Sequence, residues 1–284
     1  MIGSEPESTG ALGVGGARLR YVVEGSGRPA LVVGSAVYYP RSFSQQLRQE
    51  LRLAFIDVRH FAEDDGSPEP EVTLDTYLDD IERVRASTGF ANGIVIGHSH
   101  HGNLALEYAK RHHERVTHLV MIGSPPLEVS RTIEEAEKYW RSHASEARKK
   151  TLRDRLVALE QRALEISTPE EMYVARYLAE GPRYWYEKQY DAAFLWEGMP
   201  INIGAMKRFR AFFADGYEMS WDEHQMTAPV LVVMGEHDYA VPHTLWDEVR
   251  TCRDNLTYHL FDHSGHTPQL EEPERFDRVL LDWI

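Results

Sequence analysis

The segment Gly-His-Ser-His-His-Gly, residues 97–102, places a serine directly after a short apolar run, residues 94–96. The residues that follow, 103–108, have the spacing of a helix. A serine in a tight turn between a strand and a helix is held in a strained conformation, and the amides at the helix N-terminus point toward developing negative charge. Ser99 is therefore a candidate nucleophile.

An acid and an imidazole follow further along the chain, each after an apolar run. Asp238 lies in Gly-Glu-His-Asp-Tyr-Ala-Val-Pro, residues 235–242, and His266 lies in Asp-His-Ser-Gly-His-Thr-Pro, residues 262–268. A serine hydroxyl is a weak nucleophile at neutral pH, so it needs a base that accepts its proton and an acid that orients that base. Serine, acid and histidine in this order could supply all three groups.

These three segments together resemble the α/β-hydrolase family, in which the serine lies in a Gly-x-Ser-x-Gly turn and the acid and the histidine follow. The resemblance implies that Ser99 attacks a carbonyl carbon and that His266 takes the serine proton and returns it to the leaving group. It also implies that Asp238 orients the imidazole of His266 and stabilises its cationic form. The chain is expected to be a hydrolase of this fold.

The resemblance also implies two backbone amides that bind the oxyanion. One is the amide of His100, the residue after the nucleophile. The other lies in the turn after an early strand, where the usual His-Gly pair of the family is replaced by residues 33–34, Val-Gly. Ser35 is the candidate there, and Ala36 is the alternative.

Two family motifs have lost glycines in this chain. The second residue after Ser99 is His101 rather than glycine, and Gly102 follows. Small residues near the nucleophile let helix and strand approach closely, so His101 requires extra room or a shifted turn. Residues 57–61, Asp-Val-Arg-His-Phe, resemble the family's Asp-x-Arg-Gly-x-Gly turn with its glycines replaced. Asp57 is interpreted as structural, because its place in the chain order is wrong for the acid.

A cluster of histidines at 98, 100, 101, 112 and 113 raises the question of a metal. Metal ligands must converge on one point, whereas a turn directs neighbouring side chains apart. The sequence contains no His-Glu-x-x-His, no Gly-x-Gly-x-x-Gly that opens a helix after a strand and no Gly-x-x-x-x-Gly-Lys. No metal and no cofactor are expected.

The elements that must position these residues are short apolar runs separated by helical segments. The runs are residues 30–33, 53–56, 94–96, 119–122, 230–233 and 256–261. Most are apolar at consecutive positions, which is typical of strands covered on both faces by helices and hence of a parallel sheet. Leu74, Leu78, Ile81 and Val84 form one helical stripe between them. The predicted class is α/β, with a mostly parallel central sheet flanked by helices.

The alternation stops between about residues 125 and 229, where helical sequence replaces strands. The segment Thr-Pro-Glu-Glu at 168–171 is a capping box with proline at the first helical position, and Gly181-Pro182 ends that helix. A helical cap, residues 125–227, is therefore expected after the sixth strand. Residues 1–124 and 228–284 would form the hydrolase core.

The predicted cap is rich in aromatic residues, which either form its core or line a pocket. The candidates for substrate binding are Tyr38, Trp185, Trp196 and Tyr239.

Composition limits the class of partner. The chain has 284 residues, a formal net charge of −14 and one cysteine, Cys252. A field of that sign repels nucleic acid and anionic lipid surfaces, and one cysteine excludes an internal disulfide. No signal sequence is visible in residues 1–10 and no apolar run approaches the length that would span a bilayer. A cytoplasmic protein with a small-molecule substrate is expected, and its oligomeric state stays open.

The reaction expected from the residues is hydrolysis of a small to medium, largely apolar carboxylic ester or lactone through an acyl-enzyme. An apolar aromatic cap suits an uncharged substrate, and the net charge disfavours anions. Two alternatives stay open, an aminopeptidase or amidase of the same fold and a ligand sensor with slow turnover.

Overall fold

The computed structural model describes residues 7–68, 70–214, 216–217, 219–221 and 226–284. Its centre is one sheet of eight strands in the order β1-β2-β4-β3-β5-β6-β7-β8. The strands are β1 (Ser8–Gly13), β2 (Arg18–Glu24), β3 (Arg28–Gly34), β4 (Leu51–Asp57), β5 (Gly93–His98), β6 (Val116–Ile122), β7 (Val230–Gly235) and β8 (Leu256–Phe261). The six apolar runs of the sequence lie on β3 to β8, so those strand predictions are confirmed.

The strands β3 to β8 pair in parallel, whereas β1 and β2 form an antiparallel edge. Every residue of β7 is buried, as expected for a strand covered on both faces. The edge strands β1 and β2 were not predicted. Four of the six β1 residues are exposed, and the strand contains few apolar residues, so its sequence carries little hydrophobic signal.

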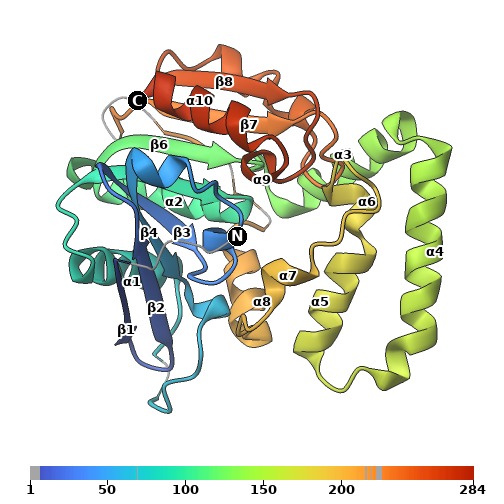
Figure 1. Cartoon of the computed structure of the whole chain (residues 1–284), viewed down its shortest axis with the longest axis horizontal. Helices are drawn as coiled ribbons and strands as arrows, with labels where there is room; N and C mark the ends of the chain where they lie inside the picture. Colours follow the sequence, from blue (N-terminus) through green and yellow to red (C-terminus); the bar gives the residue numbers. More distant parts are fainter. Residues whose placement is uncertain (1–6, 69, 215, 218, 222–225) are drawn as a thin grey trace.

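Helices cover the sheet. Two of them connect parallel strands, α1 (Leu74–Ser87) between β4 and β5 and α2 (His100–Arg111) between β5 and β6, and α9 (Pro268–Glu271) and α10 (Pro273–Trp283) follow β8. The predicted stripe on α1 is buried at Leu78, Ile81 and Val84, and Thr73 caps the helix by accepting from the amide of Thr76. In Figure 1, α10 lies across β7 and β8, and α2 lies near the centre of the sheet. The mostly parallel α/β architecture is thus confirmed.

A second group of helices stands between β6 and β7. They are α3 (Val129–His143), α4 (Glu146–Arg162), α5 (Pro169–Ala179), α6 (Gly181–Tyr184), α7 (Ala193–Trp196) and α8 (Ile203–Phe212). Thr168 and Glu171 form the predicted capping box at the start of α5. Figure 1 shows α4 and α5 side by side, extending away from the sheet. Part of the predicted cap, residues 215, 218 and 222–225, lies outside the described residues.

The cap is attached to the sheet through α8. The amide of Asn202 donates to the carbonyl oxygen of His60, at 3.0 Å, in the short 3-10 helix η3 (Arg59–Phe61). The side chain of Asn202 caps α8 by accepting from the amide of Ala205. These contacts fix the first turn of α8 against the turn that follows β4.

Among the described helices, none is both long and apolar enough to span a membrane.

Candidate active site

Ser99 lies at the turn between β5 and α2, with φ 57° and ψ −137°. It is the one non-glycine residue with a positive φ in the described part of the chain. This region of φ/ψ is strained for a residue with a side chain, and such strain persists only where the surroundings impose it. The amide of Ser99 donates to the carbonyl oxygen of Ile122, and its own carbonyl oxygen accepts from the amide of Gly102. Both bonds hold the strained turn.

Two glycines allow α2 to approach the sheet at this turn. A Cβ on Gly97 would lie 2.2 Å from the carbonyl oxygen of His101, and one on Gly102 would lie 1.9 Å from Oγ of Ser124. Both distances are shorter than any normal contact. Gly102 therefore allows the close packing beside the nucleophile, one position later than the glycine of the family motif.

The room for His101 comes from Gly34 on β3. A Cβ on Gly34 would lie 2.8 Å from Nδ1 of His101 and 2.4 Å from the ring of Tyr39. Gly34 also has φ 141°, which favours glycine. The extra side chain at 101 thus occupies space that the missing side chain at 34 leaves empty.

Asp238 and His266 form a buried pair beyond the ends of β7 and β8. Oδ2 of Asp238 lies 2.6 Å from Nδ1 of His266. Oδ1 of Asp238 accepts from the amides of Ala240 and Val241, at 2.9 and 2.8 Å. Because these bonds fix the carboxylate, the imidazole donates its Nδ1 hydrogen and keeps Nε2 as an acceptor. This geometry suits a general base.

The loop that carries His266 is held on both sides. Oε1 of Glu271 accepts from the amides of Gly265 and Thr267, and Oε2 accepts from the amide of Tyr186 in the cap. Nε2 of His98 lies 2.8 Å from the carbonyl oxygen of His266. Burial raises the pKa of Glu271 to about 7. Glu271 therefore connects the histidine loop to the cap.

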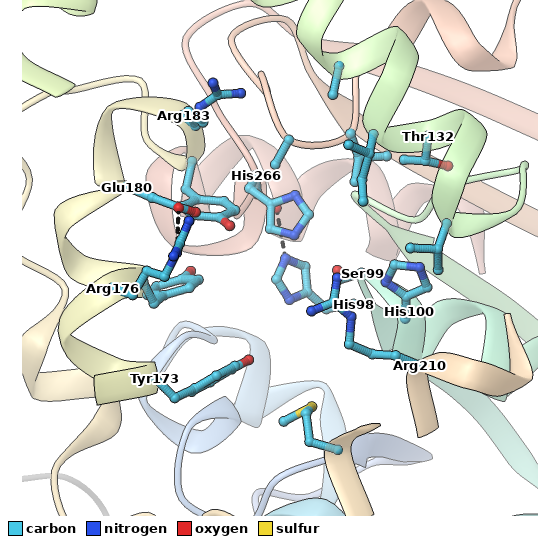
Figure 2. Close-up of a pocket in the computed structure, with 18 of the residues that line it drawn as sticks. His98, Ser99, His100, Thr132, Tyr173, Arg176, Glu180, Arg183, Arg210 and His266 are labelled. Carbon is cyan, nitrogen blue, oxygen red and sulfur yellow. Dashed lines mark hydrogen bonds and ion pairs between the residues drawn. The ribbon is translucent and has the colours of Figure 1, made fainter. Parts of the chain in front are cut away.

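Ser99, His100 and His266 line one cavity of about 760 Å³ between the sheet and the cap. Figure 2 shows the three residues around the same opening, with His98 below His266. The structure has no hydrogen bond between the Ser99 hydroxyl and His266 among its described contacts. Such bonds are often long without substrate and shorten when substrate binds. Asp238 lies behind His266, completely buried.

The predicted oxyanion amides lie in two turns. His100 is the first residue of α2, so its amide belongs to the positive end of the helix. The amide of Ala36 donates to Oδ1 of Asp57 at 2.7 Å, so it is already engaged. The hydroxyl of Ser35 accepts from the amide of Tyr38, which shapes the turn. Ser35 therefore stays the candidate for the second amide, and Asp57 has the structural role that was expected.

Three of the four predicted aromatic residues, Tyr38, Trp196 and Tyr239, line the cavity. Trp185 does not, so the cavity lining gives no support to its predicted role in substrate binding. Its side chain is 1% exposed and packs against Tyr190, with ring centroids 4.6 Å apart. Trp185 has an extended backbone, in which neighbouring side chains point to opposite sides. Tyr184 consequently takes the place beside His266, at a centroid distance of 5.7 Å.

The cavity also contains charged residues of the cap that the sequence analysis did not identify. Arg176 pairs with Glu180 at 3.0 Å, and Arg183 pairs with Glu137 at 2.7 Å. Arg210, on α8, extends into the cavity toward the side of Ser99 and His100 (Figure 2). The helical spacing of residues 176, 180 and 183 could have indicated a shared face. No sequence signal distinguishes Arg210 from a surface arginine.

Two of the histidines considered as metal ligands, His98 and His101, lie along a line of hydrogen bonds that also includes Tyr39 and His60. Tyr39 Oη lies 2.8 Å from Nδ1 of His101 and 3.4 Å from Nδ1 of His98. Nε2 of His101 lies 2.9 Å from Nε2 of His60, whose Nδ1 lies 3.2 Å from Tyr77 Oη. Burial lowers the pKa of His98 and of His60 to about 3. Neutral rings that hydrogen-bond to one another are typical of a packed polar core.

The chain matches the family described as alpha/beta hydrolase fold over residues 26–273. It is 32% identical over 268 residues to the AB hydrolase superfamily protein YclE of Bacillus subtilis (strain 168), covering 94% of this chain and 95% of that protein. It is 24% identical to a proline iminopeptidase of Clostridioides difficile (strain 630), covering 78% of this chain and 75% of the other. An α/β fold family hydrolase from Bacillus anthracis str. Sterne superposes with a TM-score of 0.70 at 19% identity, covering 98% and 99% of the two chains.

Proposed function

The chain belongs to the α/β-hydrolase fold family, and on that premise we propose that it is a serine hydrolase that cleaves a carboxylic ester or lactone through an acyl-enzyme. One observation carries the proposal. His266, whose Nδ1 lies 2.6 Å from Oδ2 of the buried Asp238, lines the same cavity as Ser99 in its strained turn. A buried acid, an oriented imidazole and an accessible hydroxyl are the three groups that acyl transfer requires.

The proposed reaction has two halves. Oγ of Ser99 attacks the carbonyl carbon while Nε2 of His266 takes the hydroxyl proton. The tetrahedral intermediate collapses, the bond to the leaving oxygen breaks, and His266 returns the proton to that oxygen. Water then attacks the acyl-enzyme with His266 as base, and the acid product leaves with Ser99 restored. Asp238 stabilises the imidazolium in both halves.

The negative oxygen of each tetrahedral intermediate is proposed to accept from the amides of His100 and Ser35. The amide of His100 is preorganised because it opens α2. The Ser35 turn is held by the hydrogen bond from the amide of Ala36 to Asp57 and by the Ser35 hydroxyl. Two fixed donors need no reorganisation during the reaction, which is the source of their catalytic effect.

An aminopeptidase is the second candidate, and one observation favours it. Two carboxylates, Glu137 and Glu180, line the cavity and could bind a substrate amine. The relative in Clostridioides difficile is a proline iminopeptidase. Each glutamate, however, is paired with an arginine, which supports the ester proposal over the amine.

The test is a panel of 4-nitrophenyl esters and aminoacyl 4-nitroanilides, assayed with the wild type and with Ser99→Ala. We expect ester hydrolysis at about 1 to 1000 per second, and a loss of about 10⁴-fold or more in kcat in the variant. Faster turnover of the anilides would favour the aminopeptidase. Turnover below about 0.01 per second on every substrate would favour a ligand sensor. Unchanged activity in Ser99→Ala would contradict the mechanism.

A further inference from the structure

We propose that Arg210 binds a carboxylate of the substrate, so that the preferred substrate is an ester or lactone with a second, free acid group. The inference deepens the proposed function, because it places that acid group in the same cavity as the bond cleaved by Ser99. The argument depends on which charges in the cavity already have partners.

The charged residues of the cavity are three arginines and two glutamates. Arg176 and Arg183 each have a glutamate partner, at 3.0 and 2.7 Å. Arg210 has no carboxylate within ion-pair distance among the described residues. The cavity therefore has one positive charge in excess, and that charge is on Arg210. A charge in a concave site of limited solvent access attracts the opposite charge most strongly.

Arg210 is directed toward the reaction centre by a rigid helix. It extends from α8 toward the side of the cavity where Ser99 and His100 lie (Figure 2). Its neighbour Phe209 is 3% exposed and packs on His60 with ring centroids 4.3 Å apart. Asn202 ties the start of the same helix to His60. The backbone of Arg210 is thus held in place by the packing of α8, while its side chain is exposed.

His100 adds a second polar group on this side of the cavity. Its Nε2 is buried and has no hydrogen-bond partner among the described residues. Burial and the nearby Arg210 lower the pKa of His100 to about 4, so the ring is neutral at neutral pH. A neutral imidazole can carry its hydrogen on Nε2 and donate it to an anion. Arg210 and His100 together offer hydrogen-bond donors to one carboxylate.

The opposite choice, a substrate amine, is disfavoured by the same charges. An ammonium group would have to displace Arg176 from Glu180 or Arg183 from Glu137 before either carboxylate could receive it. A carboxylate meets Arg210 without breaking an ion pair. The formal net charge of −14 made an uncharged substrate the first expectation, but that charge belongs to the whole chain. The net charge of the arginine and glutamate side chains that line the cavity is positive.

Binding tests the proposal without turnover. The probes are 4-phenylbutanoate and its neutral amide, 4-phenylbutanamide, titrated calorimetrically into Ser99→Ala. We expect the acid to bind at least about tenfold more tightly than the amide, since a charge-assisted hydrogen bond contributes about that much. Adding Arg210→Gln should remove the preference, and Arg210→Lys should keep part of it. The matched control is Arg278→Gln, an exposed arginine on α10 that does not line the cavity, and it should leave the preference intact.

Kinetics supply the second arm, with wild type, Arg210→Gln and Arg278→Gln. The substrates are mono-4-nitrophenyl glutarate and neutral 4-nitrophenyl butanoate. Arg210→Gln should lower kcat/KM for the glutarate at least about tenfold more than it lowers kcat/KM for the butanoate. Equal binding of acid and amide to Ser99→Ala would overturn the proposal, as would loss of the preference in Arg278→Gln. A third probe, 4-phenylbutanamine, would also overturn it by binding more tightly than the acid. If no ester is cleaved but the acid preference depends on Arg210, the hydrolytic mechanism fails and the anion site stands.

Discussion

His60 and His101 face each other with their Nε2 atoms 2.9 Å apart and their ring planes only 6° from parallel. Both stand where the family motifs have glycine, His60 after β4 and His101 after Ser99. One Nε2 must donate and the other accept. Burial lowers the pKa of both rings, so both are neutral and in opposite tautomers along this bond. The two departures from the motifs are therefore one structural feature, and each side chain supplies the partner of the other.

The pairing predicts that His60→Ala and His101→Ala are not additive. Either change leaves a buried ring nitrogen without its partner, which costs about 1–3 kcal/mol. The double variant removes both groups, so its loss of stability should be smaller than the summed single losses by about 1 kcal/mol. Urea unfolding of the four proteins measures this coupling. Losses that simply add would show that the contact has no energetic role.

Trp185 and Trp196 should respond differently to truncation. Trp185 is buried outside the cavity, so Trp185→Ala should lower the free energy of unfolding by about 3–5 kcal/mol and leave substrate preference unchanged. Trp196 lines the cavity beside Tyr177, with ring centroids 4.7 Å apart, so Trp196→Ala should change KM or preference among esters. Unfolding curves and an ester panel for both variants give the comparison. The reverse pattern would show that Trp185 reaches the substrate.

Glu271 should make stability depend on pH. Its pKa is raised by burial from 4.5 to about 7, so the folded state binds its proton more tightly than the unfolded state does. This contribution is complete below about pH 4.5 and is lost as the pH rises through 7. The free energy of unfolding of the wild type should therefore fall, relative to that of Glu271→Gln, between pH 4.5 and 8. Denaturant titrations at several pH values measure the difference.

The matched control for this titration is Glu274→Gln, which removes an exposed acid from α10. Its unfolding free energy should follow that of the wild type at every pH. If Glu271→Gln also runs parallel to the wild type, Glu271 does not change its protonation on unfolding in this range.

Asp57 and Asp238 are both buried acids at strand ends, and their substitutions should separate structure from catalysis. Asp57 accepts from the amide of Ala36 and pairs with Arg20 at 2.7 Å, so Asp57→Asn should cost about 2 kcal/mol of stability. Its kcat should fall less than tenfold. Asp238→Asn should instead lower kcat about 10³- to 10⁴-fold. Unfolding and steady-state kinetics on both variants check this, and a greater kcat loss in Asp57→Asn would reverse the assignment.

The parallel core of the fold could be predicted because its physical signal is local. Buried strands such as β7 must be apolar on both faces, and the caps of α1 and α5 require particular residues at fixed positions. The edge strands β1 and β2 lack such a signal, because a partly exposed hairpin tolerates many residue types. The sequence therefore predicts the centre of the sheet better than its edge.

The site was predictable in part for a similar reason. Ser99, Asp238 and His266 belong to segments whose spacing is set by turns at strand ends. The direction of Trp185 depends on a change from helix to extended backbone at α6, which the composition does not reveal. Arg210 has no carboxylate partner among the described residues because each cavity glutamate pairs with another arginine, and the sequence does not show which arginine each glutamate contacts in the folded chain. The partnership of His60 and His101 joins positions that are 41 residues apart.

The most direct measurement for the account is labelling with a fluorophosphonate, followed by mass mapping of the adduct. Ser99, activated by His266 and Asp238, should carry the label in the wild type. Ser99→Ala should take up none, and Asp238→Asn should react about 10³-fold more slowly. An adduct on another residue, or equal labelling rates in the wild type and Asp238→Asn, would contradict the proposed catalytic role of these three residues.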